Sequence, residues 1–421
     1  MQDTNILIVG AGAAGLMAAC TLAKAGKKVT VLEARDRVGG RIHTDVDGFV
    51  FKHAELGAEF IHGNLPVTMQ VIREAGLELI SAEFEMWQHR DGKLERGQWD
   101  TPGWDKLMHE LYKLKEDVTI GDFLRQHFSD EQYESLRQSV IRFISGYDTA
   151  DPDKASAYAL REEWSGGNDD PQYRVAGGYA EIITYLADES RRHGAQFHLN
   201  SVVEHIALSD EAVTVTLTGG VQHKAGKLIV GLPLGVLQAR TIAFWPEIKQ
   251  YEDAFAQIGF GAIVKLLLEF KEPFWEADGR QRMSFVMSDA QIPTWWTQHP
   301  VRTRLLTGWL GGLAAERKKH LTDQELMQIG IRSLAKIFNK SETFLKENLI
   351  AWKVVNWTTD PFTLGSYVYD ILGSHNARKV LSKPIDDRLY FAGEFIYEGP
   401  SMGTVEAALT SGLEAAKKLI A

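Results

Sequence analysis

The chain has almost no cysteine: Cys20 is the only one among 421 residues. An internal disulfide and a cysteine metal cluster are therefore excluded, no metal site is expected, and a reducing compartment suits the composition. Cys20 lies in a run of small and apolar residues, 14–23, which favours a buried, inert thiol over a reactive one.

Long hydrophobic runs are also missing. No uninterrupted apolar stretch reaches the roughly 20 residues that cross a bilayer, so the sequence does not support a membrane-spanning helix. The first residues lead into an apolar stretch with no basic region before it and no small-residue cleavage pattern after it. We therefore expect no secretory signal and a cytoplasmic protein.

Positive charge is in deficit, because 46 lysines and arginines face 56 aspartates and glutamates, for a formal net charge of -10. An acidic surface is repelled by phosphate, so we expect neither nucleic acid nor a membrane as partner. A cationic small molecule meets no such penalty. The sequence leaves the oligomeric state open, and a homodimer is one option.

The composition is otherwise that of a globular protein, 44% hydrophobic and 24% charged, at a length that suggests two or three domains. Near the start, residues 5–9 show a buried-strand pattern, residues 16–25 a helix pattern and residues 28–33 a second strand pattern. Strand, helix and strand within about thirty residues predict a βαβ unit with parallel strands.

A glycine-rich motif joins the first strand to the helix. Gly10, Gly12 and Gly15 form GxGxxG. The first glycine permits a tight turn, the second a close approach to a pyrophosphate, and the third close packing of helix and strand. Glu33 ends the second strand, where an acidic side chain accepts hydrogen bonds from both ribose hydroxyls of an adenosine. With the free N–H groups of the helix N-terminus, these residues predict a dinucleotide site.

The stretch after the second strand favours FAD over NAD, between which the glycine motif alone does not decide. Residues 33–41 read EARDRVGGR, which places two more glycines and Arg41 where a second loop can reach the pyrophosphate. A guanidinium binds phosphate through two parallel hydrogen bonds, which lysine does not replace well.

The remainder of the chain changes character more than once. Residues 81–172 are polar, rich in tryptophan and charge, and mostly helical in pattern. Later segments show strand patterns and a final helix pattern, at residues 196–199, 201–207, 212–218, 227–232, 258–271, 302–308, 388–392 and 404–420. No repeat or low-complexity linker separates them, so we expect interleaved domains around a cleft.

Several strings resemble the flavin-containing amine oxidases, the family of monoamine and polyamine oxidases. VGAGAAGLMAA at residues 9–19 and LEARDRVGGR at residues 32–41 are similar to the N-terminus of that family. Other strings match in the order of the family: ELGAEFIHG at 55–63, GGY at 177–179, GLPLGVL at 231–237, KEPFW at 271–275, DPFTLGSY at 360–367 and FAGE at 391–394.

The resemblance implies an α/β fold in which a Rossmann-like FAD-binding domain is interleaved with a mixed α+β substrate-binding domain. We expect residues 1–80, 172–250 and 380–421 to form the FAD-binding domain. Residues 81–171 and 251–379 are then expected to form the substrate-binding domain.

The same resemblance implies which residues hold FAD: Gly10, Gly12, Gly15, Glu33, Arg41, Ala58, Val203, Glu394, Thr404 and Val405. Thr404 is predicted to begin the last helix, so the N–H groups and positive dipole end of that helix would face the flavin O2. Ser366 stands where monoamine oxidases attach FAD through a cysteine, so the cofactor is expected to be non-covalent.

Lys265 lies among apolar residues on a predicted strand. From the residues alone, it is as readily a guard on an edge strand as a functional group. The resemblance implies a catalytic role, because the matching lysine of the family holds a water molecule against flavin N5, the atom that accepts hydride.

Tyr367 resembles the family's tyrosine in front of the flavin, one wall of an aromatic cage that orients the amine and favours its neutral form. The alternative is an aromatic side chain packed in a core. Thr404 stands where monoamine oxidases have a second tyrosine, and Tyr397, Trp357 or Phe395 could replace that wall.

Other residues are assigned by their position in the resemblance. His62 matches a histidine that lies near the substrate nitrogen in animal polyamine oxidases, and we expect it to be catalytic rather than structural. Glu59 and Glu398 are candidates to bind a second ammonium of a polyamine. Phe60 stands where L-amino acid oxidases have an arginine for the substrate carboxylate, which favours plain amines over amino acids.

The sequence thus predicts an FAD-dependent amine oxidase whose substrates are a primary or secondary amine and O2. Hydride would pass to flavin N5, the imine would be hydrolysed, and reoxidation would give hydrogen peroxide. The alternatives are an L-amino acid or aromatic-amine oxidase, a related flavin desaturase, and a flavoprotein that has lost catalysis and serves as a binding module.

Overall fold

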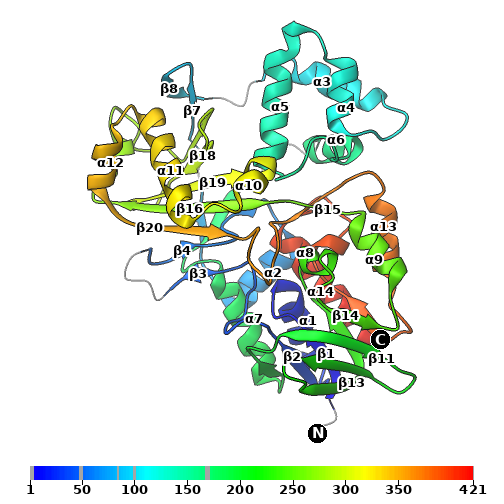
Figure 1. Ribbon diagram of the computed structural model, residues 1–421. Helices are drawn as coiled ribbons and strands as arrows, with labels where there is room; N and C mark the ends of the chain where they lie inside the picture. Colours follow the sequence, from blue (N-terminus) through cyan, green and yellow to red (C-terminus); the bar gives the residue numbers. More distant parts are fainter. Residues whose placement is uncertain (1–3, 47–50, 83–84, 98–100, 166–170, 421) are drawn as a thin grey trace.

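The computed structural model describes residues 4–46, 51–82, 85–97, 101–165 and 171–420. Figure 1 shows two large β-sheets, one in the lower half of the view and one across its middle, with a lobe of helices beyond the second sheet. The elements of each sheet come from segments far apart in the sequence, as expected for interleaved domains.

Within the described residues, eight strands form the first sheet, in the order β10-β2-β1-β13-β12-β11-β14, with β22 paired to β13. They are β1 (Thr4–Val9), β2 (Val29–Leu32), β10 (Gln196–His198), β11 (Val203–Leu208), β12 (Val213–Leu217), β13 (Gln222–Val230), β14 (Ala243–Trp245) and β22 (Leu389–Phe391). Strands β10, β2, β1, β13 and β22 run parallel, whereas β11, β12 and β13 form an antiparallel meander. The predicted βαβ unit and Rossmann-like sheet are confirmed.

Helix α1 (Ala13–Lys24) connects β1 to β2, and its small residues let it pack closely. A Cβ on Gly412 of α14 (Val405–Ile420) would lie only 2.1 Å from the carbonyl oxygen of Ala14, so these two helices touch backbone to backbone. Cys20 is buried in this packing, and burial raises the pKa of its thiol. The expectation of a buried cysteine is confirmed.

Seven strands form the second sheet of the described chain, in the order β20-β16-β19-β18-β17-β7-β8. They are β7 (Met86–Arg90), β8 (Lys93–Arg96), β16 (Ile263–Phe270), β17 (Phe285–Ser288), β18 (Thr294–Trp296), β19 (Leu305–Gly311) and β20 (Leu349–Asn356). Lys265 lies on β16, which pairs with β19 on one side and β20 on the other. The alternative that Lys265 guards an edge strand is therefore wrong.

One face of the second sheet carries an apolar core. Leu266 and Leu268 of β16 pack there with Ala315 of α10 (Gly312–Lys318), Leu334 of α11 (Asp323–Phe338) and Leu345 of α12 (Glu342–Asn348). Because successive side chains of a strand point to opposite faces, Lys265 points away from this core.

The lobe of helices contains α3 (Trp104–Lys113), α4 (Ile120–His127), α5 (Glu134–Gly146) and α6 (Ala157–Ser165), around an apolar core of its own. The mostly helical pattern of residues 81–172 is thus confirmed, except near its start. There β7 and β8 form a hairpin that extends the second sheet. Its turn residues Asp91 and Gly92 have φ of 52° and 77°, the backbone of a type I′ turn, for which Asp-Gly is a strong sequence signal.

The remaining described elements are short strands that pair outside the two sheets and helices that connect or cover them. The strands are β3 (Thr44–Asp45), β4 (Ala54–Glu55), β5 (Ile61–His62), β6 (Leu79–Ser81), β9 (Gln172–Val175), β15 (Gly259–Phe260) and β21 (Val368–Tyr369). The helices are α2 (Pro66–Ala75), α7 (Ala180–Arg192), α8 (Leu234–Gln238), α9 (Lys249–Ala256) and α13 (Ser374–Leu381), with 3-10 turns at Glu131–Tyr133, Phe274–Glu276 and Glu394–Ile396. None of the described helices has the length and apolar composition needed to cross a membrane.

The predicted strand at residues 258–271 is interrupted. The chain leaves the β15 ribbon and begins β16 after Gly261, where a Cβ would lie 1.9 Å from the hydroxyl of Thr149. The predicted single strand is therefore two strands, β15 and β16, and the close contact with Thr149 lies between them.

The core behind the first sheet includes residues that the sequence assigned to the substrate-binding domain. Phe255, Ile258, Val368 and Ala377 pack there with Leu228 of β13. Helices α9 and α13 therefore belong to the packing of the first sheet, and the domain boundaries at residues 250 and 380 stay predictions.

Gly15→Ala is expected to destabilise the protein, because the added Cβ would lie 1.9 Å from the carbonyl oxygen of Gly10 and push α1 away from β1. Overpacking of this kind costs about 1–3 kcal/mol and should lower the Tm in thermal unfolding of the cofactor-free protein. Gly12→Ala is the matched control, since a Cβ there meets nothing within 4 Å. A Gly15→Ala protein with the Tm of wild type would contradict this account of the packing.

Candidate active site

A cavity of about 2510 Å³ is lined by residues of both sheets and of the helical lobe. Pockets for drug-sized ligands measure roughly 300–1,000 Å³, so this one has room for a large cofactor and a substrate together. The predicted site residues that line it are Gly10, Gly12, Glu33, Arg41, Ala58, His62, Val203, Lys265, Tyr367, Glu394, Thr404 and Val405. Gly15 does not line it but supports the turn from behind, against Gly10.

The glycine-rich turn after β1 has the shape that a pyrophosphate needs. Gly10 has φ of +97°, and a Cβ on it would lie 2.7 Å from the carbonyl oxygen of Gly231. A Cβ on Gly12 would meet nothing within 4 Å, so the backbone is bare on the cavity side. A β-bridge between Gly12 and Gly39 brings the second glycine loop alongside. The N-terminus of α1 is therefore open to phosphate oxygens.

The Glu33 side chain is fixed at the end of β2. Its Oε2 accepts a hydrogen bond from the Ala11 N–H at 2.7 Å, and its Oε1 accepts one from the Arg35 N–H at 2.9 Å. Each carboxylate oxygen can accept a further hydrogen bond, so the group remains able to bind ribose hydroxyls. This arrangement fits the adenosine end of FAD.

Arg41 and Glu394 meet in the cavity although they are far apart in the sequence. Arg41 Nη1 donates to the Glu394 carboxylate and to the Ser366 carbonyl oxygen. A guanidinium has five N–H donors, so Arg41 keeps others for a phosphate. The residues present thus fit a flavin dinucleotide.

The last helix begins one residue later than predicted. Thr404 precedes α14, and its hydroxyl accepts a hydrogen bond from the Ala407 N–H at 3.3 Å, as an N-cap residue does. Thr404 and Val405 both line the cavity, so the N-terminus of α14 is available to the cofactor. Contacts of the individual residues with FAD stay predictions.

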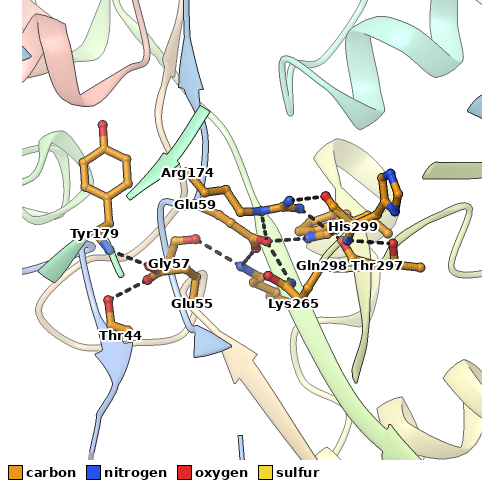
Figure 2. A network of polar contacts seen from close by, with 11 residues as sticks. Thr44, Glu55, Gly57, Glu59, Arg174, Tyr179, Lys265, Thr297, Gln298 and His299 are labelled. Atoms are coloured by element: carbon orange, nitrogen blue, oxygen red, sulfur yellow. Dashed lines mark hydrogen bonds and ion pairs between the residues drawn. The ribbon is translucent and has the colours of Figure 1, made fainter. Parts of the chain in front are cut away.

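Figure 2 shows the polar network around Lys265. The lysine is only 1% exposed. Its Nζ donates to Glu59 Oε2 at 2.9 Å and to the Gly57 carbonyl oxygen at 3.2 Å, and it lies 5.3 Å from the centroid of the Trp296 ring. An ammonium has three N–H donors, so one remains for a partner in the cavity that Lys265 lines.

Glu59 does not bind a substrate ammonium, contrary to the expectation from the sequence. Its Oε1 already accepts hydrogen bonds from Arg174 Nε at 3.1 Å and from Trp296 Nε1 and Gln298 Nε2 at 3.0 Å each. Burial opposes the charged form, but Lys265 and Arg174 hold the pKa of this carboxyl below its usual value. The Glu59 charge is therefore committed inside the protein.

Tyr367 forms part of the cavity wall. Its ring lies at 27° to the ring of Trp309, with 6.5 Å between the centroids, and its hydroxyl donates to the Tyr147 carbonyl oxygen. A Cβ on Gly403 would lie 3.2 Å from the Tyr367 ring, so the loop before α14 packs against it. Burial raises the pKa of Tyr367 well above its usual value, which keeps the hydroxyl neutral.

Two of the candidates for the second aromatic wall are held in other packing. Phe395 is 1% exposed and meets Phe255 edge-on, with 6.0 Å between the ring centroids. Trp357 is buried and donates its indole N–H to the Leu56 carbonyl oxygen at 2.9 Å. All three residues line the cavity, but Tyr397 is the one that is not buried, so it remains the candidate.

His62 lies in a group of rings that line the cavity. Its ring centroid is 6.1 Å from that of Phe60 and 6.2 Å from that of Tyr147. Burial lowers the pKa of His62, although a hydrogen bond with Gln172 acts the other way. His62 is therefore neutral near neutral pH. Further rings of the group were not singled out from the sequence: Phe285, Trp296 and Trp309.

Asp148 and Glu163 form a pair of carboxyl groups on the cavity that was not predicted from the sequence. Asp148 is 8% exposed, and its Oδ2 has no hydrogen-bond partner among the described residues. Burial and the charge of Glu163 raise the pKa of Asp148 well above its usual value, and burial raises the pKa of Glu163 to about 7. Both residues line the cavity, on which Glu163 keeps accessible surface, and both act electrostatically on Tyr367.

No sequence pattern announces this carboxylate pair. Asp148 follows α5, and Glu163 lies on α6, so only the folding of the helical lobe brings them together. Glu398, the other glutamate considered for a second ammonium, also lines the cavity. It is partly exposed and lies 3.2 Å from the Nδ1 of His375.

The fold and the cavity define a dinucleotide-dependent oxidoreductase. Residues 13–420 match the model of a protein family described as flavin containing amine oxidoreductase. The chain belongs to this family. It is thus a flavin-dependent enzyme that acts on CH–NH bonds, with FAD as its cofactor. The only cysteine, Cys20, does not line the cavity, so no thioether to FAD can form there.

Similar proteins are found among polyamine oxidases and histone demethylases. Polyamine oxidase 3 of Oryza sativa subsp. japonica is 29% identical over 98% of this chain and 88% of that protein. Lysine-specific histone demethylase 1 homolog 3 of Arabidopsis thaliana is 27% identical over 100% of this chain, which spans only 30% of that protein's length. Lysine-specific histone demethylase 2 of Homo sapiens is 28% identical, and the chain spans 54% of its length.

Solved structures share the fold over nearly the whole chain. A putrescine oxidase bound to putrescine has a TM-score of 0.83 and 21% identity, with 99% of each chain covered. Cyclohexylamine oxidase from Brevibacterium oxydans IH-35A has a TM-score of 0.80 and 22% identity, again with 99% of each chain covered. The predicted fold class is confirmed.

Glu163→Gln should raise the Tm at pH 8 and change it little at pH 5. A carboxyl whose pKa is raised from 4.5 to about 7 binds more protons in the folded than in the unfolded state between these values, so stability falls as pH rises through this window. Glutamine does not titrate, so the variant does not lose this stability as the pH rises. Glu162→Gln is the matched control, because Glu162 is exposed and paired with Arg161.

Differential scanning calorimetry at the two pH values measures both Tm differences. A Glu163→Gln protein that is less stable than wild type at pH 8 would contradict the raised pKa of Glu163 beside Asp148.

Proposed function

We propose that the chain oxidises an amine that carries a second positive charge, a diamine or a polyamine. The observation that carries this proposal is the buried Asp148 carboxyl with Glu163 beside it, which keeps accessible surface on the cavity near Tyr367. Two neighbouring carboxylates disfavour each other's charged form. A substrate ammonium would neutralise the negative charge of Asp148 and Glu163, and it would donate a hydrogen bond to Asp148 Oδ2, which has no partner among the described residues.

The similar proteins support the same substrate class. Relatives from Oryza sativa subsp. japonica and Arabidopsis thaliana are polyamine oxidases by name, and one similar structure holds putrescine, a diamine. Each of these amines carries at least two nitrogen atoms.

Bound FAD supplies the acceptor for a hydride from the carbon beside the substrate nitrogen, and O2 restores it with release of hydrogen peroxide. Tyr367 and Trp309 would exclude water from the reacting nitrogen and favour its neutral form, which is able to lose hydride. Neutral His62 adds no positive charge beside that nitrogen. Lys265 would hold a water molecule with its remaining N–H, and hydrolysis of the imine would complete the reaction.

An L-amino acid fits this cavity less well than a diamine. Phe60 stands where L-amino acid oxidases have an arginine for the substrate carboxylate. The guanidinium of Arg174 lies 4.4 Å from the centroid of the Phe60 ring, but this guanidinium is already paired with Glu59. An aromatic amine or the apolar substrate of a desaturase would leave Asp148 and Glu163 without a cation.

Diamines are expected to be better substrates than monoamines of the same chain length, and Asp148→Asn should abolish most of the difference. Loss of a charge-assisted hydrogen bond, worth about 1.5–3 kcal/mol, raises the KM of the diamine about 10- to 100-fold. The KM of the monoamine should not change. Initial rates of hydrogen peroxide formation with putrescine and n-butylamine measure both values.

Asp153→Asn is the control for this substitution, because Asp153 is exposed and paired with Arg125. The assay should also compare lysine with cadaverine, its decarboxylated counterpart. Equal KM values for putrescine and n-butylamine in wild type, or a preference for lysine over cadaverine, would contradict the proposal.

Lys265→Met should slow one half-reaction about a hundredfold or more while FAD stays bound. Methionine has nearly the length of lysine but no N–H donor, and Glu59 keeps its other three hydrogen bonds. Stopped-flow absorbance, first with amine under anaerobic conditions and then with O2, separates the two half-reactions. Wild-type rates in both would refute a catalytic role of Lys265.

A further inference from the structure

The Glu59 carboxylate is built to hold one lysine. Three N–H donors occupy its Oε1, and its Oε2 is left for Lys265 at 2.9 Å (Figure 2). Arg174 is itself fixed by the carbonyl oxygens of Thr297 and His299, at 3.0 Å each. A carboxylate held in this way cannot rotate freely, so the position of the lysine ammonium is set by Glu59.

We propose that Glu59 is a positioning residue that supplies the counter-charge of Lys265, aims its remaining N–H into the cavity, and thereby controls the reaction of the reduced enzyme with O2. The inference rests on the proposed amine oxidase function. The step passes two electrons and two protons to each O2 and yields hydrogen peroxide and the oxidised cofactor. A fixed positive charge favours it, because oxygen gains negative charge as the electrons arrive.

The charges of the network explain why the lysine depends on Glu59. One anion, Glu59, is in contact with two cations, Lys265 and Arg174. Without the carboxylate, two buried positive charges would face each other. Arginine does not release its proton in proteins, so the lysine would become neutral instead.

The other groups around Lys265 do not replace this counter-charge. On the neighbouring strands β19 and β20, Trp309 and Val355 lie opposite Lys265, and neither carries a charge. The helices α10 and α11 pack on the other face of β16. On β4, buried Glu55 interacts electrostatically with both Lys265 and Glu59, but burial raises its pKa to about 7, and it accepts hydrogen bonds from Thr44 Oγ1 and from the Tyr179 N–H.

Glu59→Gln tests the proposal, because it removes the charge and keeps the size of the side chain. The FAD-loaded protein is reduced with dithionite, so no amine is needed, and the rate of reoxidation by O2 is measured from pH 5 to 10. The midpoint potential of bound FAD is measured over the same range by equilibrium reduction with a reference dye. The potential does not depend on turnover.

The decline of the reoxidation rate with rising pH should begin about 1–3 pH units lower in Glu59→Gln than in wild type. The pH dependence of the midpoint potential should change in the same pH interval, because a group that binds a proton near the flavin is coupled to its reduction. Glu269→Gln is the matched control, a carboxyl on the same strand that is paired with Arg304 and does not contact Lys265, and both of its profiles should follow wild type.

A double variant shows whether Glu59 acts through the lysine. If it does, Lys265→Met with Glu59→Gln has the same pH profile as Lys265→Met alone. Profiles and potentials of Glu59→Gln that coincide with those of wild type would overturn the proposal and leave Glu59 a purely structural residue. A failure of all amines as substrates would sink the proposed function but not this measurement.

A second variant covers the case in which Glu59→Gln does not fold. Gln298→Ala removes one of the three donors to Glu59 Oε1 and leaves both charges of the ion pair in place. It should lower the reoxidation rate by a smaller factor than Glu59→Gln, because Glu59 is held less firmly, and an unchanged rate would contradict the positioning role.

Discussion

The buried Glu59 carboxylate is the interaction on which the arrangement of this site depends. Its four hydrogen-bond donors come from β9, from β16, and from β18 and the loop after it, so segments far apart in the sequence meet at one anion. Two of these donors are cations, and a buried charge left without its partner costs about 3–5 kcal/mol. The network therefore fixes β16, and Lys265 with it, against the segment that carries Glu59.

Two groups of charged residues give the cavity opposite electrostatic character, positive near Lys265 and negative near Asp148 and Glu163. Around Glu59, two cations share one anion, which leaves an excess of positive charge where Lys265 lines the cavity. Asp148 and Glu163 are two carboxyl groups within hydrogen-bond reach of each other, and neither is paired with a cation among the described residues. Tyr367 and Trp309 belong to the aromatic wall of the same cavity. Such a distribution would orient an amine that is neutral at its reacting nitrogen and charged at its other end.

The part of the fold that could be predicted from the sequence is the part that local rules determine. Gly10 needs a bare Cα for its φ of +97° and Gly15 for its contact with the Gly10 carbonyl oxygen, and both reasons are set within a few residues of the chain. Lys265 was found only because the chain resembles a family, since its strand reads like any buried strand. The hairpin at Asp91 and Gly92 carried a local signal that the tryptophan-rich, charged composition of the region obscured.

The parts of the site that could not be predicted depend on tertiary contacts. Glu59 was considered a ligand for a substrate ammonium because its partners Arg174 and Gln298 lie more than a hundred residues away in the sequence. Asp148 and Glu163 acquire their raised pKa values only when α5 and α6 close around them. Burial of a carboxylate, and the sign of the charge beside it, are properties of the fold and not of the local sequence.

The most direct test of the account is a crystal structure of the FAD-loaded protein. The account predicts the flavin ring in the cavity, with its N5 within hydrogen-bond reach of Lys265 Nζ directly or through one water molecule, while Glu59 still holds the lysine. A lysine turned away from the ring, or a ring that lies elsewhere in the cavity, would contradict it.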